Sequence, residues 1–173
     1  MYLLKFISKF YILLFLILGS FSQEKEISID TAKINFVFVS KEVEGTIGDL
    51  ETNSKIDILN FENSVLEGSV SLESLKTGNF LRDWHLMSKK YFFRQKYPRL
   101  HFKSNEIIKT GNDYQIEGIL TMKGVSKSIQ MKATVNNNSI QMTGSINTAD
   151  WNIRILKEWE KNNVGFNAAL YLK

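Results

Sequence analysis

Residues 114–146, YQIEGILTMKGVSKSIQMKATVNNNSIQMTGSI, contain the pattern that decides the fold. Apolar or small residues occupy every second position through three successive runs, and mostly polar residues lie between them. The residues of the apolar parity are Tyr114, Ile116, Gly118, Leu120 and Met122, then Ile129, Met131, Ala133 and Val135, then Ile140, Met142, Gly144 and Ile146. Alternation sustained over five or more residues is typical of a β-strand with one buried and one solvated face.

Short turn-forming segments at 123–126 and 136–138 separate these runs. Such connections favour antiparallel neighbours, because a parallel pair of strands needs a long crossover. A period of two dominates most of the chain from residue 27 onward, which indicates about eight strands. The buried faces of these strands can meet in two packed sheets or line a closed barrel. Glycines within the strands relieve crowding where a sheet bends sharply, so we predict an all-β, antiparallel barrel.

One segment departs from this period. Residues 79–97, NFLRDWHLMSKKYFFRQKY, place Leu81, Trp84 and His85 at helical spacing, and Asn79 is a suitable N-cap residue. Pro98 disfavours helix at the residue before it and so ends the segment. We therefore expect one short helical insertion in the middle of the barrel.

The first 22 residues have the layout of a secretory signal. Lys5 and Lys9 precede a nine-residue apolar run at 10–18, FYILLFLIL, and small residues follow it. Nine residues are too few to span a bilayer, which takes about 20. We interpret residues 1–22 as a signal peptide and 23–173 as a single mature domain in the periplasm or outside the cell. An uncleaved N-terminal membrane anchor is the alternative.

The composition excludes several classes of function. The chain has 22 Lys and Arg, 18 Asp and Glu, two His and no Cys, so a disulfide scaffold and a cysteine nucleophile are ruled out. Without Lys5 and Lys9 the mature net charge falls from +4 to +2, and its charges are interspersed, which argues against a nucleic-acid partner. We find no metal-ligand, cofactor or catalytic spacing, and we predict a protein that is not an enzyme.

Four blocks in order resemble the YceI family of exported lipid-binding proteins. They are Val43–Gly48 (VEGTIG), Ser74–Leu86 (SLKTGNFLRDWHL), Tyr91–Ser104 (YFFRQKYPRLHFKS) and Gly118–Lys127 (GILTMKGVSK). The resemblance covers essentially the whole mature chain. It implies an extended lipocalin-like barrel with an apolar channel, a periplasmic or secreted location and a long isoprenoid or other amphiphilic lipid as ligand. It carries over no catalytic residue.

The strand pattern and the resemblance together select candidates for the channel lining. These are Phe36, Phe38, Leu72, Phe92, Phe102, Leu120, Met122, Met131, Ile146, Trp151 and Phe166. Phe and Met suit irregular cavities. The alternative is that the same side chains fill a solid barrel, which would then act as an envelope-stress or protein-interaction module without a ligand.

The polar cluster beside the helical insertion has two interpretations. Arg82, Trp84 and His85 could contact a lipid head group at the mouth of the channel. Arg82 and Asp83 could instead hold the insertion onto neighbouring backbone groups, which is the more common use of such residues.

Energetics restrict the ligand class. Each buried methylene contributes roughly 0.8 kcal/mol, whereas association costs about 4–15 kcal/mol. Binding through apolar contact alone therefore needs roughly fifteen carbons or more. We expect a long-chain lipid or isoprenoid as partner, no stable membrane insertion once the signal is removed, and a homodimer as an open alternative to the monomer.

Overall fold

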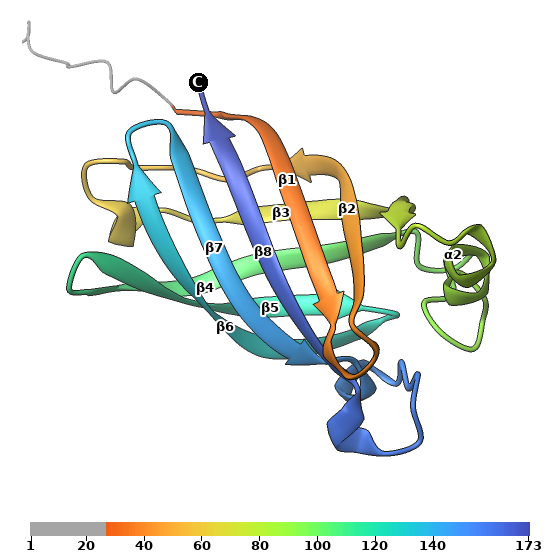
Figure 1. Ribbon diagram of the computed structural model, residues 1–173. Helices are drawn as coiled ribbons and strands as arrows, with labels where there is room; N and C mark the ends of the chain where they lie inside the picture. Colours follow the sequence, from red (N-terminus) through yellow and green to blue (C-terminus); the bar gives the residue numbers. More distant parts are fainter. Residues whose placement is uncertain (1–26) are drawn as a thin grey trace, which may run out of the picture.

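The computed structural model describes residues 27–173, and within them eight strands form one closed barrel (Figure 1). Each strand pairs antiparallel with its neighbours in the sequence, and β1 closes the barrel against β8. The strands are β1 (Ile29–Phe38), β2 (Val43–Thr52), β3 (Glu67–Lys76), β4 (Arg99–Thr110), β5 (Asp113–Met122), β6 (Val125–Asn136), β7 (Ser139–Asn147) and β8 (Asn163–Leu172). The predicted all-β antiparallel barrel of about eight strands is confirmed. The signal-peptide prediction for residues 1–22 lies outside the described residues.

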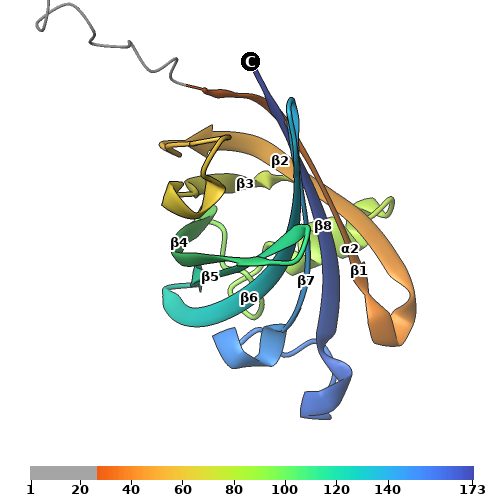
Figure 2. The same ribbon diagram turned by 90° about the vertical axis from the view of Figure 1, so that its left-hand side faces the viewer.

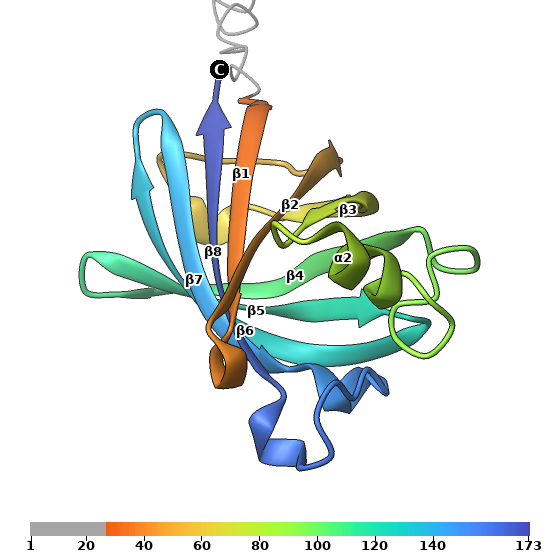
Figure 3. The same ribbon diagram turned by 45° about the vertical axis from the view of Figure 1, so that its right-hand side comes forward.

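The connections between strands alternate between the two ends of the barrel, because the strands run antiparallel in sequence order. One end carries η1 (Val39–Lys41), α2 (Phe80–Leu86), η3 (Thr148–Trp151) and η4 (Trp159–Lys161), and we call it the α2 end (Figure 3). The opposite end carries η2 (Phe61–Asn63) between β2 and β3 (Figure 2). No helix within residues 27–173 is both long enough and apolar enough to cross a membrane.

The helical insertion begins as the sequence predicts but is shorter than the segment that predicted it. The Asn79 side chain accepts a hydrogen bond from the Arg82 backbone N–H at 3.0 Å, which caps the first turn of α2. The helix ends at Leu86, and turns follow it up to Pro98. Within these turns Tyr91 and Phe92 are buried, so the insertion packs its own aromatic residues against the barrel.

Strand β3 contains an irregularity that changes which of its residues face inward. Thr46 pairs with Lys76 and Gly48 with Ser71, so two steps along β2 correspond to five along β3. The Ser74 hydroxyl accepts from the Gly48 N–H and donates to the Ser71 carbonyl, each at 2.7 Å. These bonds replace ladder hydrogen bonds where the extra residues bend the strand.

The interior is only partly solid. Ile107, Ile116 and Ile140 are buried on β4, β5 and β7, and they belong to the hydrophobic core. Phe61 of η2 joins them and meets the Tyr114 ring edge-on, with ring centroids 4.9 Å apart. These residues fill part of the barrel interior and leave the remainder for a cavity.

Candidate functional site

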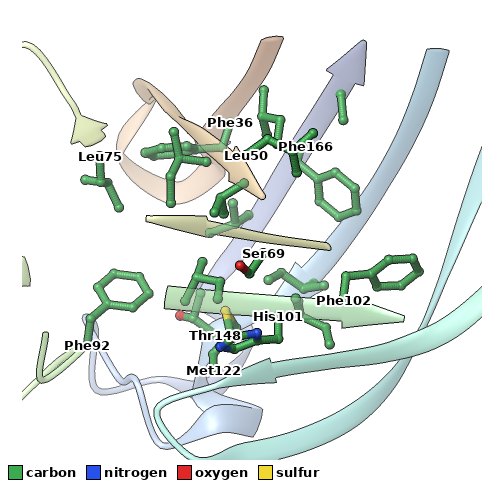
Figure 4. Close-up of a pocket in the computed structure, with 18 of the residues that line it drawn as sticks. Phe36, Leu50, Ser69, Leu75, Phe92, His101, Phe102, Met122, Thr148 and Phe166 are labelled. Carbon is green, nitrogen blue, oxygen red and sulfur yellow. The ribbon is translucent and has the colours of Figure 1, made fainter. Parts of the chain in front are cut away.

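The barrel contains a cavity of about 810 Å³, within the usual size range of sites for small organic molecules. All eight strands contribute side chains to its lining, and α2 and the turns after it contribute more. Most of the lining side chains are aliphatic, aromatic or methionine (Figure 4). Such a surface can remove a long apolar chain from water, and it offers few partners for a polar ligand.

Most of the side chains that the sequence selects do line this cavity. Nine of the eleven are in the lining, namely Phe36, Phe38, Phe92, Phe102, Leu120, Met122, Met131, Ile146 and Phe166. Eight of these lie on strands, and Phe92 comes from the turns after α2. Leu120, Met122, Met131 and Ile146 belong to the apolar parity of residues 114–146. The alternating pattern therefore located the wall of the cavity.

Leu72 does not line the cavity, contrary to the sequence-based expectation. It is 1% exposed and belongs to the hydrophobic core. Val70 before the irregularity of β3 and Leu75 after it both line the cavity, which shows that the inward parity changes between them. A prediction from unbroken alternation places Leu72 on the cavity wall, because it takes no account of the extra residues in β3.

Trp151 is also outside the lining. It lies in η3, is 2% exposed, and donates a hydrogen bond from Nε1 to the Leu120 carbonyl at 3.0 Å. This bond satisfies the indole N–H, which a purely apolar cavity could not do. Trp151 thus packs the η3 turn against β5.

Several lining residues were not selected from the sequence, although most of them follow the same signal. They include Ile34, Val70, Ile129, Met142, Val164 and Ala168. All six lie on strands and share the parity of selected neighbours. Leu50 and Leu75 are different, because each follows a register shift in its strand and only the folded backbone reveals its direction.

Three lining phenylalanines lie against glycines of the adjacent strand. The pairs are Phe36 with Gly45, Phe102 with Gly118 and Phe166 with Gly144. In each pair the ring occupies the space that a Cβ at the glycine would need. The rings can therefore lie along the wall instead of projecting across the cavity, which keeps the interior open.

Of the three residues predicted to contact a lipid head group, two line the cavity and one does not. Arg82 and His85 are in the cavity lining, whereas Trp84 is 70% exposed and is not. Arg82 donates from Nε to the Thr77 hydroxyl and from Nη2 to the Thr77 carbonyl, both at 2.7 Å. The Asp83 carboxylate accepts hydrogen bonds from the Thr77 N–H and hydroxyl. Arg82 and Asp83 thus hold α2 against the end of β3.

Lys123 connects two segments at the α2 end. Its Nζ donates to the Lys90 carbonyl at 2.9 Å and to the Asn152 carbonyl at 3.1 Å. Burial lowers the pKa of the Lys123 ammonium group, because desolvation disfavours its charged form. Lys123 begins the two-residue turn between β5 and β6, where it and Gly124 both have positive φ.

The polar groups of the lining are dispersed. Glu67 forms an ion pair with Lys103 at 2.8 Å, and the His85 ring meets the Tyr91 ring edge-on at 5.2 Å. Within residues 27–173, no three His, Asp or Glu side chains lie close enough together to hold a metal ion. The lining as described has the chemistry of an apolar binding site with isolated polar groups.

Known proteins are similar to this chain in sequence and in fold. A UPF0312 protein of Photorhabdus laumondii is 36% identical over 89 residues, which are 51% of this chain and 46% of that protein. The chain therefore spans about half of that relative's length. The structure of BcnA from Burkholderia cenocepacia superposes with a TM-score of 0.72 at 20% identity, covering 83% of this chain and 99% of that one.

A second solved structure shares the fold at lower identity. It is a polyisoprenoid binding domain from Saccharophagus degradans, with a TM-score of 0.59, 14% identity, and coverage of 86% of this chain and 98% of that one. The family described as the YceI-like domain matches residues 24–172, which include every strand of the barrel. The chain therefore belongs to the YceI-like domain family, as the four sequence blocks predict.

Proposed function

We propose that this chain binds one long-chain amphiphilic lipid, such as a polyisoprenoid, with the apolar tail inside the barrel. The observation that carries the proposal is the cavity of about 810 Å³ with its predominantly apolar lining. The tail would lie among the phenylalanine, methionine and aliphatic side chains, and desolvation of the tail would drive binding. The polar head would remain near Arg82 and His85 at the α2 end.

The comparison with Saccharophagus degradans supports the polyisoprenoid class of ligand. That protein is described as a polyisoprenoid binding domain, and its barrel is similar to this one. At roughly 0.8 kcal/mol for each methylene, a polyprenyl chain supplies enough apolar contact to exceed the cost of association. A ligand with only a few carbons does not.

We further propose that the protein is an exported carrier that performs no chemistry on its ligand. The basic start and short apolar run within residues 1–22 support export. The dispersed polar groups of the lining support binding without catalysis, because catalysis needs an acid, base or nucleophile held close to a partner. The alternative function, a filled barrel that binds other proteins, is less well supported because of the cavity.

A cavity-filling variant tests the proposal. Ile34 lines the cavity on β1, and its neighbour Lys33 points outward into solvent. Ile34→Trp places an indole inside the cavity, whereas Lys33→Trp adds the same group to the outer face of the same strand. We expect fluorescent-lipid uptake to fall at least tenfold in Ile34→Trp and to remain unchanged in Lys33→Trp.

Lipid that co-purifies with the protein provides the second measurement. Native mass spectrometry before and after organic extraction should show one bound lipid that extraction removes, and it also reports the oligomeric state. Equal uptake by both tryptophan variants would contradict binding inside the barrel. The absence of both co-purified lipid and fluorescent-lipid uptake would contradict the carrier function.

A further inference from the structure

The outer face of α2 exposes three large apolar side chains. Phe80 is 79% exposed, Leu81 is 72% exposed and Trp84 is 70% exposed. Residues three and four apart share one face of a helix, so Trp84 adjoins both other side chains. We call these three residues the α2 patch. A cluster of this kind on one short helix marks a surface that meets an apolar partner, in contrast to isolated exposed residues such as Leu59 at the opposite end.

The patch is continuous with the lining of the cavity. Leu81 belongs to the patch and also to the cavity lining. His85, one turn later on the helix, lines the cavity as well. Figure 3 shows α2 lying over the barrel end between β2 and β4. A partner on the patch would therefore lie next to the part of the cavity that Leu81 and His85 line.

The segment that contains the patch is strongly basic. Residues 77–98 include five Lys or Arg residues and a single carboxylate, Asp83. At the opposite end, the segment 53–66 between β2 and β3 has one Lys against two acids. The positive charge thus lies on the same connection as the exposed apolar residues, which favours an anionic partner.

Three of these cations are available for such a partner. Lys89, Lys90 and Lys96 are exposed, and within residues 27–173 no carboxylate forms an ion pair with them. Their ammonium groups lie over aromatic rings of the same segment, 5.1–6.0 Å from the ring centroids. The other two cations are engaged, because Arg94 pairs with Glu73 and Arg82 bonds to Thr77.

We propose that the α2 end docks onto the surface of an anionic phospholipid bilayer. Phe80 and Trp84 would insert at the level of the head groups, where aromatic side chains are favoured, and the three lysines would meet lipid phosphates. A second copy of the chain fits this face poorly, because two such faces would bring like-charged lysines together. The inference rests on the proposed function for its purpose, since docking would place the α2 end of the cavity against the source of the lipid.

Vesicle sedimentation with delipidated protein tests the docking directly. The probes are phosphatidylcholine vesicles and mixed phosphatidylglycerol–phosphatidylcholine vesicles, neither containing isoprenoid. We expect binding to the mixed vesicles only. Tryptophan emission should shift to the blue as Trp84 leaves water, measured in a Trp159→Phe background because Trp159 is half exposed whereas Trp151 is already buried. Phe80→Ser combined with Trp84→Ser should weaken binding by roughly tenfold or more. Each of Lys89→Gln, Lys90→Gln and Lys96→Gln should weaken it roughly fivefold at low salt.

Matched controls come from the opposite end of the barrel. Leu59 is 88% exposed and Lys109 is exposed there, so Leu59→Ser and Lys109→Gln should leave vesicle binding unchanged. Equal binding to both kinds of vesicle, no binding to either, or equal loss in the control variants would overturn the inference. A dimer that Trp84→Ser dissociates would overturn it as well, because a second copy would then cover the patch.

A second assay on the same preparations separates this inference from the proposed function. It measures uptake of a fluorescent lipid that is diluted into the protein solution without detergent. Intact uptake without vesicle binding would overturn docking and leave lipid binding standing. Vesicle binding without uptake would support docking and contradict the carrier function.

Discussion

Gly144 and Phe166 lie directly opposite each other on β7 and β8, and the Phe166 ring occupies the space in front of Gly144. A Cβ built at Gly144 would be 2.6 Å from Cζ of this ring, well inside van der Waals contact. The Phe102 ring also occupies the space in front of a glycine, here its diagonal neighbour Gly118 on β5, where the corresponding distance is 2.5 Å. The glycines thus let large aromatic side chains lie along the wall, and the volume they vacate becomes part of the cavity.

Gly144→Ala should therefore reduce both stability and lipid uptake. The new methyl group forces the Phe166 ring away from the wall and into the cavity, and overpacking of this kind costs about 1–3 kcal/mol. Chemical denaturation and fluorescent-lipid uptake measure the two effects. Adding Phe166→Leu should restore most of the loss in stability.

The neighbouring glycine provides the control for this substitution. No atom lies within 4 Å of a Cβ built at Gly165 on β8, and its φ is not positive. Gly165→Ala should be neutral or stabilise the protein by about 0.4–1 kcal/mol, because it restricts the unfolded chain. If the two alanine variants behave alike, the close approach of Phe166 to Gly144 has no energetic importance.

Leu72 and Val70 should respond differently to truncation although they lie two residues apart on β3. Leu72 is buried in the solid core, so Leu72→Ala should cost about 2–5 kcal/mol and leave lipid uptake intact. Val70 borders the existing cavity, so Val70→Ala should cost only about 1–2 kcal/mol and should change lipid affinity. Thermal unfolding and uptake assays on both variants test this, and a change in uptake for Leu72→Ala alone would refute it.

Loss of the indole N–H at Trp151 should destabilise the protein more than loss at Trp159. Trp151→Phe leaves the Leu120 carbonyl without its partner at a buried position, which costs about 1–3 kcal/mol. Trp159 is half exposed and donates to the exposed Asp150 carboxylate, so water can replace the bond in Trp159→Phe. Denaturation midpoints of the two variants provide the measurement, and equal shifts would argue against the buried hydrogen bond.

The contribution of Lys123 to stability should depend on pH in the alkaline range. Burial lowers its pKa in the folded protein below the unperturbed value of 10.5, so the unfolded chain retains the proton at pH values where the folded chain has lost it. By linkage, the free energy of unfolding should rise with pH between the lowered pKa and 10.5. Lys123→Gln should lack this rise when urea unfolding of both proteins is followed across that range. A parallel pH dependence in the variant would exclude Lys123 as the source.

The existence and pairing of most strands follow from local pattern. Within residues 114–146, alternation and two short turns predict three antiparallel strands, and β5, β6 and β7 are found there. The N-cap at Asn79 was equally visible, because the capping side chain and the turn it caps are neighbours in the sequence. The end of α2 at Leu86 was not visible in the sequence. Helical spacing continues after Leu86, but burial of Tyr91 and Phe92 in the following turns outweighs it.

The irregularities of β2 and β3 were invisible in the sequence. Ser74 carries the hydrogen bonds that stabilise the bend in β3, but its importance depends on Gly48 in another strand. The inward directions of Leu50 and Leu75, and the exclusion of Leu72 from the cavity, all follow from these register shifts. Pairing between strands decides such shifts, and no run of neighbouring residues encodes them.

The amino-acid sequence by itself determined that this chain forms β-strands of alternating apolar and polar residues, with one N-capped helical insertion. Residues close together along the chain set both the alternation of each strand and the cap of the helix. Only the tertiary structure decided that the interior is open beside Phe166 and solid around Ile116, because an enclosed volume depends on how side chains far apart in the sequence meet across the barrel.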